Sequence, residues 1–197
     1  LRVLTQYGLE AKPPENVAGA RVLGLRVVDK GSSLEWKRDN QLDPLSSYMT
    51  KRNVFSWCDQ LVGHYPVCGW LRPACSYVKR MASDGSWDDL VSSDVLARLN
   101  DLNSKLKSND PVKGKWAVSP SCKGTIWCDA SCIAYGASVE IDGEIVEDAS
   151  WLRKIHDVTH INLAELESVI KGINMAISWK LSEIQIRTDS SAVFGWL

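Results

Sequence analysis

Apolar and polar residues follow two different spacings along the first part of the chain. Residues 21–36 are rich in β-branched and apolar side chains and are interrupted by the turn-forming stretch Asp29–Ser33, which predicts two strands joined by a hairpin. After Thr50, a residue type that caps helices, apolar side chains recur at helical spacing. The proline-containing segment Gly63–Gly69 ends this predicted helix.

Two further helices are predicted before residue 110. Pro73 suits the first turn of a helix that runs to about Met81. Ser86–Asp89 resembles a capping box, so a third helix is expected to begin there. Its apolar stripe consists of Leu90, Val91, Val95, Leu99, Leu102 and Leu106.

The spacing changes after residue 123. Three strands are predicted at Thr125–Ala130, Gly136–Ile141 and Glu144–Trp151. The pair Asp142-Gly143 between the last two is a strong hairpin signal. A helix over Leu163–Trp179 follows, and its predicted core face consists of Leu166, Ile170, Ile173 and Ile177. Glu183–Asp189 alternates as a fourth strand, and Ser190 or Ser191 can cap a last helix.

These patterns divide the chain into a mainly helical region with a β-hairpin over residues 1–110, a linker over 111–123, and an α/β region over 124–197. Apolar residues make up 45% and charged residues 24%, which is enough for a buried core. The net charge of -1 gives no global signal for nucleic acid, so such binding must come from local patches. Six cysteines without a C-x-x-C pair predict free thiols in a reducing compartment, and no apolar run is long enough to span a bilayer.

Three acids hold positions that can bring them together. Asp129 and Asp189 end the first and fourth predicted strands of the α/β region, and Glu165 lies in the first turn of its helix. If those strands are parallel neighbours, their carboxyl ends meet at one edge of the sheet, and the helix can carry Glu165 over that edge. Each acid also has a structural alternative: Asp129 as a turn residue, Glu165 in a capping box with Asn162, and Asp189 as a helix cap.

A cluster of three carboxylates predicts metal binding. Like charges raise each other's pKa unless cations neutralise them, and Mg²⁺ prefers oxygen ligands while keeping several waters. Two such ions about 3.5–4 Å apart can activate water and stabilise the leaving oxygen in phosphodiester cleavage. We therefore expect two ions, Mg²⁺ or Mn²⁺, with Asp129, Glu165 and Asp189 as both the metal-binding and the catalytic residues.

Residues 125–197 resemble the N-terminal half of the type-1 RNase H family. The resemblance rests on Asp129-Ala130-Ser131, Ala164-Glu165-Leu166 and Thr188-Asp189-Ser190. It implies an α/β fold with an RNase H-like mixed sheet and flanking helices, and a hydrolase that cleaves the RNA strand of RNA–DNA hybrids as an endonuclease. The family carries a fourth acid, an Asp near a late helix, often with a flexible His before it, as well as a last strand and later helices. This chain ends before them, so the resemblance implies a C-terminally truncated domain with an incomplete site.

The region before the linker resembles the thumb and connection of reverse transcriptases in LTR retrotransposon Pol polyproteins. Val22–Leu25, with the following hairpin and Trp36, resembles the strand pair after the polymerase palm. Thr50–Arg52 and Gly69–Pro73 resemble parts of the thumb and connection. No Tyr-x-Asp-Asp polymerase motif occurs in the sequence, so polymerase activity is not expected.

The sequence thus favours a fragment of a retroelement Pol polyprotein, because it begins at a leucine and ends within a predicted helix. The leading hypothesis is metal-dependent RNase H activity, with an RNA–DNA hybrid and the remainder of the polyprotein as partners and no membrane. An intracellular, cytoplasmic location is expected, either free or in a retroelement particle. Two alternatives stay open: a non-catalytic nucleic-acid-binding or scaffold segment of a reverse transcriptase, and an unrelated α/β domain whose acids are caps and turns.

Overall fold

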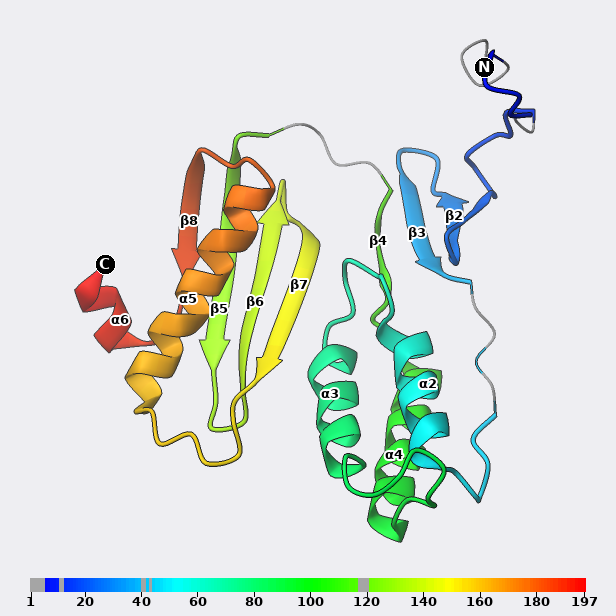
Figure 1. Cartoon of the computed structure of the whole chain (residues 1–197). Helices are drawn as coiled ribbons and strands as arrows, with labels where there is room; N and C mark the ends of the chain where they lie inside the picture. Colours follow the sequence, from blue (N-terminus) through cyan, green and yellow to red (C-terminus); the bar gives the residue numbers. More distant parts are fainter. Residues whose placement is uncertain (1–5, 11–12, 40–41, 43, 117–120) are drawn as a thin grey trace.

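The structure, a computed structural model, describes residues 6–10, 13–39, 42, 44–116 and 121–197. Within these ranges the chain forms two four-stranded sheets, and the helices α2, α3 and α4 lie in the sequence between the third and fourth strands of the first sheet. The sheet of the second half has helices beside it and contains both parallel and antiparallel strand pairs, which confirms the predicted α/β class with a mixed sheet (Figure 1).

The first sheet is antiparallel and has the order β1-β2-β3-β4. Its strands are β1 (Arg21–Val22), β2 (Leu25–Asp29), β3 (Leu34–Arg38) and β4 (Lys113–Lys115). The strand predicted over 21–28 is divided, because Leu23 and Gly24 both adopt positive φ angles, of 49° and 78°, and turn the chain back. The segment predicted as a linker contains β4, which pairs with β3, and residues 117–120 of that segment lie outside the described residues.

The helices of the first half are α2 (Lys51–Val62), α3 (Leu71–Met81) and α4 (Ser93–Ser108). Thr50 caps α2 as predicted. The predicted start of α4 was wrong, since Ser92 is its N-cap and Ser86–Asp89 forms a turn in which the Asp89 carboxylate accepts from the Ser86 amide at 2.7 Å. The fully buried core of this half includes Val54, Cys58, Leu61, Leu71, Val95 and Leu99.

The second sheet has the order β7-β6-β5-β8, in which β5 and β8 are parallel and the other pairs antiparallel. Its strands are β5 (Lys123–Ala130), β6 (Ala134–Ile141), β7 (Glu144–Leu152) and β8 (Glu183–Arg187). The predicted turn joins β6 to β7, and Asp142 and Gly143 both have positive φ, as a type I′ hairpin requires. Helix α5 (Ile161–Ser178) lies along this sheet, and α6 (Ser191–Trp196) follows β8 (Figure 1).

The buried face of α5 differs from the predicted one. Ile170 and Ile177 are 46% and 64% exposed, whereas Leu166 and Ile173 pack only partly against the core. The buried face consists of Ala164, Glu165, Ser168, Val169, Gly172, Met175 and Ala176. A Cβ atom at Gly172 would overlap Ile126 and lie 2.8 Å from the Cys128 sulfur, so small residues let the helix approach the sheet closely. The prediction was wrong because it ranked positions by hydrophobicity and not by size.

The two halves meet where β7 passes the start of α3 (Figure 1). The Asp148 carboxylate accepts from the Cys68 and Gly69 amides at 2.8 and 2.6 Å and from Arg72 Nε at 2.9 Å. Asp148 therefore holds the turn that precedes α3, while the first-turn amides of Leu71 and Arg72 donate to the Cys68 and Gly69 carbonyls.

Two expectations about the whole chain can be compared with the structure. All six cysteines are free thiols, as predicted. Among the described residues, none of the helices combines the length and the apolar character needed to cross a membrane.

Candidate metal centre

Asp129 lies within β5, which continues to Ala130, so its interpretation as a turn residue was wrong. Side chains alternate along this strand: Ile126 and Cys128 are buried towards the core, and Trp127 and Asp129 are exposed on the other side. Because β5 and β8 run parallel, their carboxyl ends reach the same edge of the sheet.

The structural alternatives for the other two acids were also wrong. Helix α5 begins at Ile161 with His160 as its N-cap, whose Nδ1 accepts from the Asn162 amide at 3.2 Å, so Glu165 is not part of a capping box with Asn162. Ser190 is the N-cap of α6 and its hydroxyl accepts from the Val193 amide at 3.4 Å. Neither Glu165 nor Asp189 therefore caps a helix.

The structure brings all three acids together. Asp129, Glu165 and Asp189 each offer a carboxylate oxygen, and these oxygens lie within 4.8 Å of one another. Asp129 and Asp189 are exposed, whereas Glu165 is buried, with 7% exposure. The group therefore combines one buried carboxylate with two that solvent can reach. This is the group that could hold a metal ion among the described residues.

The electrostatics of the group centre on Glu165. Burial raises the pKa of its carboxyl group, and the nearby carboxylates of Asp129 and Asp189 raise it further, while a hydrogen bond from the Ala130 amide acts in the opposite direction. Its Oε2 atom is buried and has no hydrogen-bond partner among the described residues. A buried oxygen without a partner is costly, and a cation at this point would satisfy it.

The chemistry of the donors fits a hard divalent cation. All three groups are carboxylates, the ligand type that Mg²⁺ and Mn²⁺ favour, and among the described residues none of the three forms an ion pair with a Lys, Arg or His side chain. The two exposed acids leave room for waters and for substrate oxygens, which Mg²⁺ commonly retains or binds.

Arg153 holds the backbone on both sides of this group and was missed by the sequence analysis. Its side chain is 4% exposed and donates to Asp157 Oδ2 at 3.0 Å, to the Ser131 carbonyl at 3.0 Å and to the Thr159 carbonyl at 2.6 Å. These bonds tie the loop after β5 to the segment before α5, and the guanidinium holds the pKa of Asp157 well below its usual range. No local pattern marks such a residue, because the bond that ties the two segments together goes to the Ser131 carbonyl, 22 residues away in the sequence.

One solved structure is similar to this chain over most of its length. The structure of the foamy viral protease-reverse transcriptase dRH in complex with ds DNA is similar with a TM-score of 0.65 and 12% sequence identity, over 89% of this chain and 32% of that chain. This chain therefore spans about a third of the length of that relative. The likeness shows that the chain shares the mixed α/β fold of part of that structure.

Comparisons by sequence add one match. A family described as Domain of unknown function (DUF7047) matches residues 50–108, which correspond to helices α2 to α4 and the segments between them. No curated protein matches the chain.

Proposed function

We propose that the second half of the chain is a metal-dependent nuclease centre that hydrolyses the RNA strand of RNA–DNA hybrids, within a retroelement Pol polyprotein. The observation that carries the proposal is the meeting of Asp129, Glu165 and Asp189 within 4.8 Å, without a paired cation and with the Glu165 Oε2 atom lacking a partner. The likeness to a viral reverse transcriptase supports the same class of substrate, a nucleic-acid duplex.

The three acids have different tasks in this proposal. Glu165 is fixed by burial and by the Ala130 amide, so it is the ligand whose position is set before substrate arrives. Asp129 and Asp189 are exposed and offer oxygens on the side from which a phosphodiester approaches. A divalent cation, when bound, supplies water activation and stabilisation of the leaving oxygen. Arg153 is a positioning residue, because it holds the segments that precede and follow the acids without being one of the ligands.

A second candidate function is a non-catalytic segment that helps to hold a duplex. It is favoured by the printed description of the similar structure, a reverse transcriptase in complex with ds DNA. In this case the same fold would bind nucleic acid through its surface, and the acids would not support cleavage.

The test is cleavage of a labelled RNA strand in an RNA–DNA hybrid with Mg²⁺ or Mn²⁺. The parent chain is expected to cleave, and Asp129→Asn is expected to lose at least roughly 100-fold in rate, since residues that only orient metal ligands already contribute 10- to 100-fold. Asp142→Asn is the matched control, because Asp142 is an exposed acid in the hairpin turn of the same sheet.

Three outcomes separate the candidates. Loss of cleavage in Asp129→Asn with normal cleavage in Asp142→Asn supports the nuclease. Equal cleavage by parent and Asp129→Asn overturns the role of the acid group. A folded parent chain that binds the hybrid without cleaving it supports the second candidate.

A further inference from the structure

The face of the second sheet opposite α5 presents an ordered set of side chains. Strand register places one row across the sheet, which consists of Arg187, Trp127, Ser138 and Asp148. The neighbouring row, nearer the carboxyl end of β5, consists of Asp129, Gly136 and Ser150. Asp189 lies beside Asp129 in the metal centre, so the second row leads directly into it.

These rows form one wall of a cavity of about 750 Å³. The opposite wall comes from the start of α3 and consists of Gly69, Trp70, Arg72 and Pro73. The carboxylate residues Asp129 and Asp189 belong to the lining as well. A volume of this order is typical of sites for small ligands, and the cavity opens beside the proposed metal centre.

Trp127 is an exposed aromatic side chain that is held in place. The residue is 46% exposed, its Nε1 donates to Glu140 Oε2 at 2.8 Å, and the Arg187 guanidinium lies 5.7 Å from the ring centroid. An indole and a guanidinium are both planar groups on which nucleobases stack. Because the indole is already fixed, little side-chain entropy is lost when a ligand stacks on it.

The cavity also contains a polar group that lacks a partner. Ser150 is one of the lining residues, and its hydroxyl oxygen is buried without a hydrogen-bond partner among the described residues. A hydroxyl can both donate and accept, so a polar ligand atom would satisfy it. This observation favours a ligand with polar edges over a purely apolar one.

We propose that the cavity binds one unpaired nucleotide, with its base against Trp127 and its phosphate at the end formed by Asp129 and Asp189. A space of about 750 Å³ accommodates a single nucleotide but not a duplex. The orientation rests on the proposed nuclease function, because a phosphate approaches two carboxylates only when a divalent cation lies between them. The site would therefore hold an unpaired end or a displaced nucleotide of the substrate.

The test is calorimetric titration of the full chain with adenosine 5′-monophosphate in Mg²⁺. Trp127→Ala is expected to weaken binding by roughly 5- to 150-fold, the range found for loss of one stacked base. Trp179→Ala is the matched control, because Trp179 is also partly exposed at 38% and its Nε1 donates to a carboxylate, Glu147, but it lies outside the lining of the cavity. Circular dichroism establishes that both variants are folded.

Ser150→Ala provides a second variant at the same cavity. It is expected to weaken the same titration by roughly 2- to 10-fold, as for loss of one hydrogen bond. Adenosine, which has no phosphate, is expected to bind more weakly than the monophosphate in Mg²⁺. Equal binding of the two ligands would overturn the orientation.

The nucleotide-binding proposal and the nuclease proposal can be overturned independently of each other. Absence of nucleotide binding by the parent, or equal affinity in Trp127→Ala and Trp179→Ala, overturns the pocket whatever the cleavage assay gives. Binding that depends on Trp127 in a chain that does not cleave hybrids supports the pocket as a base-binding site and overturns the nuclease.

Discussion

The acid group of the sheet half and the paired acids of the helical half have opposite surroundings. In the helical half, three aspartates pair with cations, in Arg38–Asp110, Arg52–Asp88 and Lys79–Asp59. In the sheet half, Asp129, Glu165 and Asp189 face one another within 4.8 Å without such a partner among the described residues. Mutual repulsion and the burial of Glu165 oppose folding, so the second arrangement is one that stability alone does not favour. The difference indicates where a ligand is needed.

The largest expected loss of stability follows from replacing the two buried arginines, Arg38 in the helical half and Arg153 in the sheet half. Arg153 and Arg38 are 4% and 5% exposed, and each pairs with an aspartate and with backbone carbonyls. Replacement of either by Met is expected to reduce the free energy of unfolding more than any other substitution below, because it leaves an aspartate and backbone carbonyl acceptors without their donor. Urea unfolding of both variants measures this loss.

Binding of Mg²⁺ separates the two variants. Arg153→Met is expected to weaken Mg²⁺ affinity by about 10- to 100-fold, since Arg153 holds the loops beside the acids. Arg38→Met is expected to leave it unchanged. Equal Mg²⁺ affinities in the two folded variants would contradict the positioning role of Arg153.

Asp148 tests whether the two halves behave as one unit. Asp148→Ala removes the acceptor for two amides just before α3 and for Arg72, which are charged hydrogen bonds between the two halves. We expect calorimetry to show two thermal transitions in the variant where the parent shows one. Glu144→Gln, which removes the more exposed contact with Lys115, is expected to change stability by less than about 1 kcal/mol. A single unshifted transition in Asp148→Ala would show that other contacts couple the halves.

Sequence patterns predicted what depends on neighbouring residues and missed what depends on distant ones. Thr50 as a cap, the Asp142-Gly143 turn and the meeting of the three acids all follow from local spacing and the order of elements. Strand β4 was missed because a segment with proline and glycine gives no strand signal and is held by its pairing with β3. Arg153 was missed for the same reason, since its role depends on the long-range bond to the Ser131 carbonyl.

The helix α5 provides a test of close packing in the sheet half. Gly172→Ala places a Cβ atom against Ile126 and the Cys128 sulfur and is expected to cost about 1–3 kcal/mol of unfolding free energy through overpacking. Gly195→Ala in α6, where no atom lies within 4 Å of the added carbon, is expected to be neutral or slightly stabilising. Urea unfolding compares them, and equal midpoints would show that α5 can move away from the sheet without loss.

The smallest expected effect is a gain in stability, and it follows from removing the carboxyl group of Glu165 from the acid group. The pKa of Glu165 is raised above its ordinary value of 4.5, so its carboxyl group favours folding in the protonated form. This contribution is complete below the ordinary value and is lost as the pH rises through the higher folded pKa. Without metal, the contribution of Glu165 to stability is therefore expected to fall as the pH rises from 4.5 towards neutral, above the range in which the lowered pKa of Asp157 acts, and Glu165→Gln should remove this part of the pH dependence. Melting temperatures in EDTA at acidic and neutral pH measure it.

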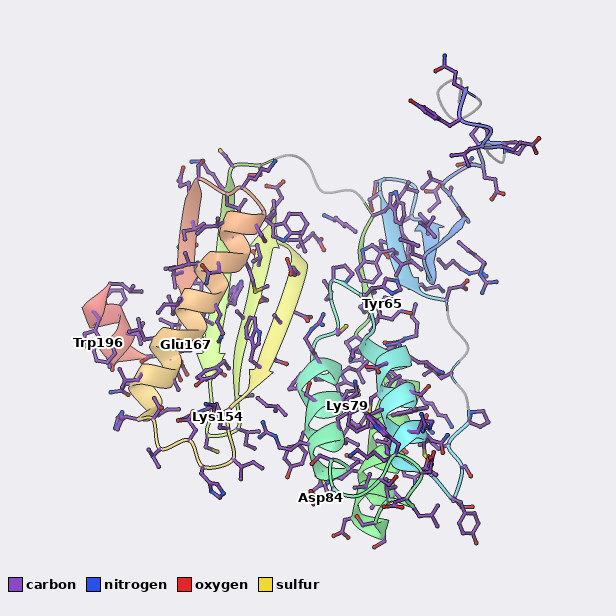
Figure 2. All side chains as sticks on the ribbon, in the orientation of Figure 1. Tyr65, Lys79, Asp84, Lys154, Glu167 and Trp196 are labelled. Atoms are coloured by element: carbon purple, nitrogen blue, oxygen red, sulfur yellow. The ribbon has the colours of Figure 1, made fainter. Side chains whose placement is uncertain are left out.

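Glu167→Gln is the matched control, because Glu167 lies on the same helix (Figure 2) and pairs with Lys171 at the surface. It should keep the pH dependence of the parent. Addition of Mg²⁺ should raise the melting temperature of the parent and of Glu167→Gln but not that of Glu165→Gln, since only a chain with the full acid group gains the binding energy. If Glu165→Gln melts at a lower temperature than the parent at neutral pH in EDTA, the carboxyl group stabilises the fold by itself, and the contrast between the two halves is lost.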